Sequence, residues 1–253
     1  MTCNNSSKLK SNKLFKESKN LINYTDNELN SLSYKESLIY DKRTYCQYYL
    51  SLLRTNNLLV FTFCSNNDYN STIIKIFLFF YFFSVHFTIN TLFFNDSTMH
   101  KIYEDNGSFN FIYQIPQIIY STIVSTFFNT LIKFLALSEN NIILIKQEKI
   151  IQINMFDKRV KKVFDTLKIK FILFFIITFF ILILFLYYIT CFCGIYTNTQ
   201  IHLIKDTIIS FVLSLLYPLG ICMIPGLFRI LALKDKKKNK KCIFIFSKLL
   251  TYI

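Results

Sequence analysis

Four long blocks of apolar residues dominate this sequence and limit what it can fold into. They lie at 73–94, 109–132, 171–192 and 207–229 and carry almost no formal charge. Each block reaches the roughly 20 residues that a helix needs to cross about 30 Å of hydrocarbon. The blocks lack the sustained alternation that a membrane β-barrel needs on its two faces. The sequence therefore predicts an all-α integral membrane protein, a helical bundle with four transmembrane helices.

The composition agrees with a membrane location. Of the 253 residues, 53% are hydrophobic, 29 are Phe and none is Trp, a balance unlike that of a soluble domain. The first 50 residues are polar and contain no continuous apolar run of the kind found in a cleavable signal peptide. The first span is therefore predicted to act as the anchor.

Positive charges cluster on one side of the predicted spans. Nine Lys or Arg precede the first span and nine lie between the second and third, whereas the two opposite loops hold one Lys each. Cytoplasmic segments of membrane proteins carry such an excess. We therefore predict a multi-pass protein in which the N-terminus, the loop 133–170 and the tail 231–253 are cytoplasmic.

The net charge of +14 raises the question of a nucleic-acid partner. The basic residues flank membrane spans, and no nucleic-acid-binding motif accompanies them, so we expect no nucleic acid. A lysine cluster directly after the fourth span is predicted to lie at the membrane surface, where each charge attracts anionic headgroups by about 1 kcal/mol. A plain topology signal is the alternative. The cluster comprises Lys234, Lys236, Lys237, Lys238, Lys240 and Lys241.

The segments before the first span divide into two parts. Residues 1–24 are rich in Asn, Ser and Lys and are predicted to form a disordered basic N-terminus. Residues 25–72 are predicted to form cytoplasmic amphipathic or interfacial helices, beginning with a capping box from Thr25 to Glu28. One helix has an apolar and aromatic face suited to a membrane surface, formed by Tyr45, Tyr48, Tyr49, Leu52 and Leu53.

Two further segments have more than one interpretation. Leu58–Cys64 is apolar but too short to span, so it is interfacial, re-entrant or packed in the core. In the loop 133–170, Phe156, Val160 and Phe164 recur at helical spacing beside Lys and Arg. Such a basic amphipathic helix rests on an anionic membrane, packs within the protein or binds calmodulin-like partners.

Polar side chains interrupt the first two spans. His86 and Asn90 lie one turn apart in the first, and Gln114, Gln117 and Asn129 lie in the second. Polar groups in hydrocarbon are costly unless they pair, so they should face other helices or a wet cavity. The alternative is a permeation path, which the lack of Asp or Glu within the predicted spans disfavours.

Two smaller signals concern shape and chemistry. Pro218 and Pro225 predict a kink in the second half of the fourth span, because proline removes an amide donor. His100 and Asp105 match the spacing of the histidine base and carboxylate in glycerolipid acyltransferases, but no acyl-acceptor motif accompanies them, and chance explains the match. The cysteines show no zinc-binding spacing, so no metal or cofactor is predicted.

Three segments of this sequence carry a resemblance: Asn95–Met99, Phe109–Gln117 and Asn198–Asp206. They resemble a C-terminal multi-span module of uncharacterised protist transmembrane proteins, in which similar segments often end very large, cysteine-rich surface proteins. A fainter similarity is to the helices of polycystin-1-like receptors. The resemblance implies a membrane-embedded module and implies no catalytic residues.

The sequence predicts a non-enzymatic multi-pass membrane protein that forms the transmembrane part of a receptor-like or channel-associated assembly. Its partners would be the bilayer, anionic headgroups and other subunits in a homo- or hetero-oligomer. A cation channel subunit is the alternative, and a membrane-bound lipid acyltransferase is the third hypothesis.

Overall fold

The chain is helical in every regular element of the part that the structure describes. The computed structural model describes residues 24–64, 68–94, 96–104, 111–149, 156–197, 199–234 and 240–251. Within these ranges helices form and no strand does, which confirms the predicted all-α class. Four candidate spans are long and apolar enough to cross a membrane, as predicted: Thr72–Phe93, Ile112–Ala136, Lys158–Ile195 and Gln200–Lys234.

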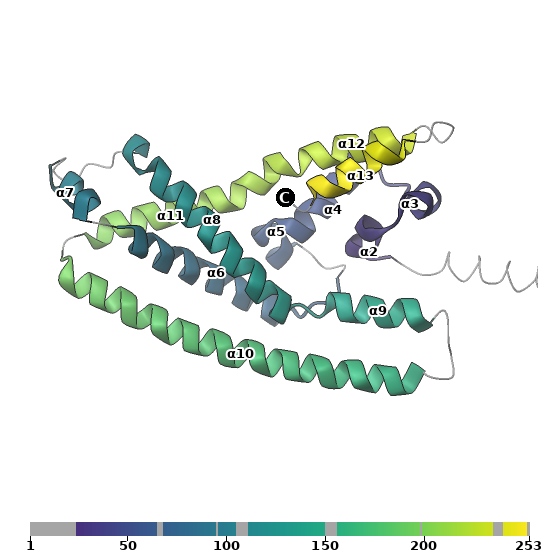
Figure 1. The fold of residues 1–253 in the computed structure, drawn as a ribbon, viewed down its shortest axis with the longest axis horizontal. Helices are drawn as coiled ribbons and strands as arrows, with labels where there is room; N and C mark the ends of the chain where they lie inside the picture. The colour runs from purple at the N-terminus through teal and green to yellow at the C-terminus, as the bar shows by residue number, and fades with distance from the viewer. Residues whose placement is uncertain are drawn as a thin grey trace, which may run out of the picture.

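The bundle is built around the first span. Figure 1 shows α8 (Phe111–Ala136) and α11 (Gln200–Ile221) crossing near α6 (Thr72–Phe93), with α10 (Phe156–Ile195) along one side. The main core includes Leu78 and Val85 of α6 and Phe174 of α10, all fully buried. In the most apolar 18-residue stretch of α6, 50% of the residues are buried inside the protein. In the corresponding stretch of α10, only 11% are buried. α6 is therefore the central helix, and α10 presents most of its surface outward.

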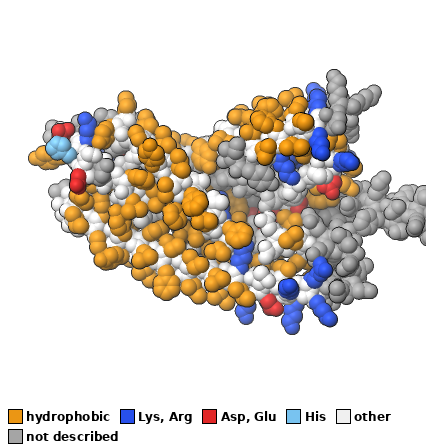
Figure 2. All heavy atoms as spheres, in the orientation of Figure 1, with side chains coloured by type: hydrophobic (Ala, Val, Ile, Leu, Met, Phe, Trp, Pro, Cys, Tyr) orange, Lys and Arg blue, Asp and Glu red, His pale blue; other side chains and the backbone are white. Residues whose placement is uncertain are grey.

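The remaining helices gather mainly at one end of the bundle. Figure 2 shows most of the visible Lys and Arg side chains on this end and mainly hydrophobic side chains between it and a small group of charged side chains at the opposite end. We call the end rich in Lys and Arg the basic end; α7 (Asp96–Glu104) lies at the opposite end (Figure 1). The helices of the basic end are α2 (Asp26–Ser31), α3 (Tyr34–Tyr40), α4 (Tyr45–Asn56), α9 (Glu139–Lys149), α12 (Met223–Lys234) and α13 (Lys241–Leu250), and α5 (Leu58–Phe63) joins them to α6.

Reciprocal side-chain caps start the short N-terminal helices. The Glu28 amide donates to Thr25 Oγ1 over 3.2 Å, and the Thr25 amide donates to Glu28 Oε2 over 2.7 Å. This confirms the predicted capping box. The helices α3 and α4 begin with the same motif at Ser33 and Thr44. Such caps satisfy backbone donors that helices this short leave free.

The apolar face predicted for Tyr45–Leu53 exists, but protein covers it. Tyr48, Leu52 and Leu53 are buried in a small core together with Cys222 of the fourth span. The helix is therefore seated on the protein and does not present this face to a membrane surface. In the next segment, α5, Leu58 and Phe61 are buried in the main core, whereas Leu59 and Phe63 are 44% and 56% exposed.

The basic segment 156–167 forms the first turns of α10 and not a separate helix. α10 runs without a break for 40 residues, so this segment continues directly into the third span. Val160 and Phe164 are 37% and 68% exposed, so their predicted face has no full cover within the described protein.

The fourth span is broken, as its prolines predict. α11 ends at Ile221, Cys222 forms a turn, and α12 resumes at Met223. Two tyrosines of α4 donate to carbonyl groups around the break: the Tyr49 hydroxyl to Leu219 O over 3.0 Å and the Tyr45 hydroxyl to Met223 O over 3.3 Å. A broken helix is tolerated where its freed backbone groups find such partners.

A buried ion-pair network fixes α12 to the N-terminal helices. Arg229 is 1% exposed and donates from both Nε and Nη2 to Asp41 Oδ2, over 3.0 and 2.8 Å. Arg43 donates to both oxygens of the same carboxylate, over 2.8 and 3.0 Å. The Arg229 guanidinium also lies between the rings of Tyr48 and Phe244. Segments far apart in the sequence thus meet at one buried charge cluster.

Electrostatics at this cluster favour the ionised carboxylate. Burial alone raises the pKa of Asp41, but hydrogen bonds and positive charge from Arg43 and Arg229 outweigh burial and lower the pKa below its ordinary value of 3.8. The stability contributed by the carboxylate is therefore complete above pH 3.8 and is lost as pH falls through the folded-state pKa.

Asp41→Asn should destabilise the protein by about 3 kcal/mol or more, because it leaves the buried Arg229 guanidinium without an ion-pair partner among the described residues. Arg43 keeps Asp26, with 4.0 Å between Nη1 and Oδ1. Denaturation of the purified protein in neutral detergent measures the change. Asp165→Asn, at an exposed position of α10, is the matched control and should change stability little. Equal stabilities for the two variants would contradict a structural role for the network.

Candidate functional site

The inner face of α8 is polar along much of its length. Gln114, Ser121 and Ser125 are at most 4% exposed and recur at helical spacing. Small residues such as serine let helices approach closely within a membrane. The Ser121 hydroxyl donates to Ile118 O of its own helix, over 3.0 Å, so it needs no partner from another helix. α8 packs against α6, α10 and α11.

α6 contributes a histidine and an asparagine to the same interior. Asn90 is fully buried, and its Nδ2 donates to Ser210 Oγ of α11 over 2.6 Å. His86 is 1% exposed and packs edge-on against Phe211, with 5.4 Å between ring centroids. Within the described chain, His86 Nδ1 has no hydrogen-bond partner. Both residues thus face other helices, as expected from their cost in hydrocarbon.

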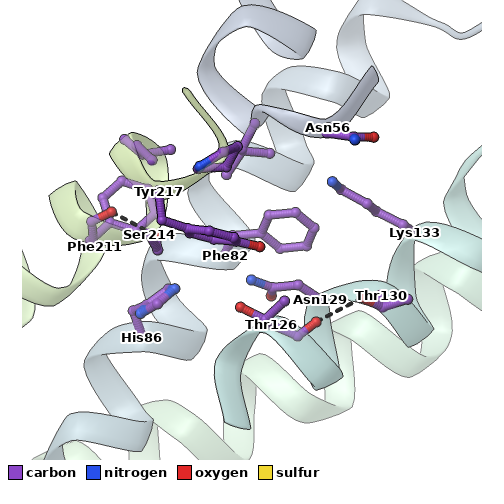
Figure 3. A pocket seen from close by; sticks show the side chains of 13 residues that line it. Asn56, Phe82, His86, Thr126, Asn129, Thr130, Lys133, Phe211, Ser214 and Tyr217 are labelled. Atoms are coloured by element: carbon purple, nitrogen blue, oxygen red, sulfur yellow. Dashed lines mark hydrogen bonds between the residues drawn. The ribbon is translucent and has the colours of Figure 1, made fainter. Parts of the chain in front are cut away.

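A cavity opens where α8 and α11 diverge toward the basic end. Figure 3 shows its lining, which comes from α4, α5, α6, α8 and α11. Its volume is about 70 Å³, enough for a few water molecules at roughly 10–15 Å³ each. The lining residues are Asn56, Leu58, Phe82, His86, Thr126, Asn129, Thr130, Lys133, Phe211, Ser214, Leu215, Tyr217 and Pro218. Predicted polar residues of the first two spans, His86 and Asn129, therefore meet in one place.

Lys133 places a positive charge at this cavity. Its Nζ lies 5.5 Å from the centroid of the Phe82 ring and 5.8 Å from that of Phe61. No Asp or Glu lines the cavity, and within the described residues Lys133 makes no ion pair. A desolvated cation–π contact is worth about 2 kcal/mol, less than the several kcal/mol that desolvating an ion costs. The aromatic rings therefore offset only part of the cost of a charged Lys133.

A carboxylate lies within the fourth candidate span, which corrects the prediction that the spans contain no Asp or Glu. Asp206 is fully buried, and neither of its oxygens has a hydrogen-bond partner in the described part of the chain. The span was predicted to start at residue 207, whereas α11 starts at Gln200. The helical recurrence of His202, Asp206 and Ser210 was the sequence signal for the longer helix, and all three are buried.

The predicted lysine cluster is only partly within the described chain. Lys234 is exposed at the end of α12, and Lys241 is exposed at the start of α13. Lys240 Nζ donates to Leu231 O over 3.4 Å. Lys236, Lys237 and Lys238 lie outside the described residues. Binding of this cluster to anionic headgroups stays a prediction.

Only one residue of the acyltransferase-like pair lies in the described chain. His100 is exposed on α7, with Nε2 3.1 Å from Glu104 Oε1, and Asp105 lies outside the described residues. The described residues also contain no group of His, Cys, Asp or Glu that could hold a metal ion.

Comparison with family models, curated proteins and solved structures gives no match to this chain.

Asp206→Asn should raise the thermal stability of the protein, because it removes a buried charge that lacks a partner. Thermal unfolding in neutral detergent at pH 7 measures the change, with Asp165→Asn as the exposed control. A lower melting temperature for Asp206→Asn would show that the ionised carboxylate is stabilising and would contradict its description as unpartnered.

Proposed function

We propose that this chain is a non-enzymatic, multi-pass membrane protein that forms the transmembrane part of a receptor-like or channel-associated assembly. Its basic end faces the cytoplasm, with both termini on that side. The observation that carries the proposal is the buried junction at Arg229, through which the fourth span and the helices of the basic end form one unit.

The outward surface of the spans supports residence in hydrocarbon. The most apolar 18-residue stretch of the third span has a mean hydropathy of 3.0. The span exposes large apolar side chains such as Phe180 (61%), Leu184 (64%) and Leu186 (69%). Such an extended apolar surface would be an aggregation hazard in water. Lipid chains or the apolar spans of another subunit would cover this surface.

The orientation follows from where the charges lie. Figure 2 shows Lys and Arg side chains gathered at the basic end, beyond the hydrophobic surface of the bundle. An excess of Lys and Arg marks the cytoplasmic side. At the opposite end, α10 and α11 are separated by only four residues, from 196 to 199. That end offers little room for a ligand-binding domain, so a signal from outside would arrive through a membrane partner.

The broken fourth span supports a coupling role. Between α11 and α12 the chain turns at Cys222, where tyrosines of α4 hold the exposed carbonyl groups. Beyond the turn, Arg229 binds Asp41 and also donates to Leu29 O over 2.9 Å. A displacement of α11 would thus be passed to α2 and to the segment after α3.

A cation channel subunit is the second candidate, and Asp206 is the observation in its favour. A buried carboxylate within a span is characteristic of ion pathways. Lys133 opposes this candidate, since its charge at the cavity would repel a cation passing through the same interior. The lipid acyltransferase is the third hypothesis; its His100 is exposed on α7, and its Asp105 lies outside the described residues.

Topology is tested by labelling single cysteines on sealed vesicles, after the native cysteines have been replaced. Cysteines at Glu104, Lys161 and Lys241 occupy positions on α7, α10 and α13. We expect an impermeant reagent outside the cell to label only the position at Glu104, and the other two only after permeabilisation. External labelling at Lys161 would contradict the four-span topology.

Assembly is tested with a photo-crosslinking amino acid at Phe180, on the outward surface of α10. Ile123, 61% exposed on α8, is the matched control on a different face. We expect discrete crosslinks to another polypeptide from Phe180 and not from Ile123. Crosslinks to lipid alone from both positions would contradict an assembly through α10.

A further inference from the structure

We propose that the cavity at Lys133 binds a small inorganic anion of halide size. This inference goes beyond the proposed role in an assembly and does not depend on it. The cavity is shown in Figure 3, where Lys133 and Asn129 extend from α8 and His86 extends from α6 toward the space beside Phe82.

The charge balance of the cavity is the first argument. Lys133 belongs to a candidate membrane span, and the residues that line its cavity include no carboxylate. Its nearest described partners are the faces of Phe61 and Phe82, which attract a cation but do not neutralise it. An uncompensated ammonium group in a low-dielectric interior is strongly disfavoured, whereas an ammonium paired with an anion is not. Lys133 is partly exposed, and the residues that line the cavity offer its ammonium group no anionic partner.

The hydrogen-bonding groups of the cavity are the second argument. The hydroxyls of Thr126, Thr130 and Ser214 donate to carbonyl groups of their own helices, so their oxygens add no donor to the cavity. The donors that remain on lining residues are the Lys133 ammonium, the Asn56 and Asn129 amides, the Tyr217 hydroxyl and the His86 ring. Asn129 Oδ1 is a buried acceptor without a partner in the described chain, so an anion, which only accepts hydrogen bonds, would bind through the donors and chiefly through the charged Lys133.

The size of the cavity is the third argument. About 70 Å³ accommodates a halide ion with a small number of waters, on the scale of roughly 10–15 Å³ per water. Phe82, Phe211 and Leu215 form apolar walls that a weakly hydrated anion tolerates. Large organic anions such as gluconate do not fit this volume.

An anionic lipid offers the same chemistry from another source. An apolar groove of about 430 Å³ lies between α8 and α11 and shares Tyr217 with the cavity. An acyl chain in that groove could bring its headgroup toward Lys133. The experiment therefore has separate arms for a free anion and for lipid.

The experiment follows the melting temperature of purified, delipidated protein in neutral detergent while chloride replaces gluconate at constant ionic strength. We expect a saturable rise with chloride. Lys133→Met should weaken the apparent chloride affinity by about tenfold or more, since it removes a charge-assisted hydrogen bond. Lys168→Met, at an exposed position of α10, is the matched control and should keep the full response.

A second variant keeps the test informative if Lys133→Met does not fold. Asn129→Asp places a carboxylate one turn from Lys133 and supplies an anionic partner within the chain. Its melting temperature should be independent of chloride and should approach that of the chloride-saturated native protein. A native protein that does not respond to chloride, or a Lys133→Met variant that responds equally, would overturn the proposal. A rise produced by anionic lipid but not by chloride would also overturn it in favour of a headgroup.

Discussion

The bond between Arg229 and Asp41 determines how the two parts of this protein are held together. Its carboxylate accepts hydrogen bonds from two guanidinium groups, and Arg229 is stacked between Tyr48 and Phe244. Buried charges are tolerated when they are paired and fully hydrogen-bonded, and they become costly as soon as one partner is lost. Asp41 and Arg229 lie 188 residues apart. Together with the hydrogen bonds from Tyr45 and Tyr49, this contact closes the fold of the basic end onto the fourth span.

A second contact at the basic end works in the same direction. Glu28 caps α2 and also accepts from Lys146 Nζ of α9 over 2.8 Å. Glu139, at the start of α9, accepts from Asn27 Nδ2 over 2.7 Å. The helix that follows the second span is therefore tied to the same N-terminal segment as α12, the second half of the fourth span. Both connections use charge-assisted hydrogen bonds, which are stronger than neutral ones.

Hydropathy and capping motifs within short stretches of sequence predicted the helices well. The environments of Asp206 and Lys133 were missed because they depend on contacts between distant segments. About 20 apolar residues are needed to cross hydrocarbon, so hydropathy alone identifies the spans, and the cap at Thr25 is readable within four residues. Asp206 was placed outside its span because charge argues against hydrocarbon, yet α11 buries it within the protein. Lys133 was read as the start of a loop for the same reason. Lys133 lines a cavity that is formed by residues of α4, α5, α6, α8 and α11. No single segment of the sequence predicts how these five helices pack together.

The length of α10 has a mechanical consequence. Lys170 Nζ donates to Leu137 O over 2.7 Å and ties α10 to the segment that follows α8. From Phe171 to Ile195 the helix then continues for about 37 Å at about 1.5 Å per residue, more than an average hydrocarbon thickness of about 30 Å. Helices with such an excess adapt by tilting. Since α10 is the least buried of the four spans, a thinner or thicker bilayer would change its tilt first, so bilayer thickness becomes an input to the protein through this helix.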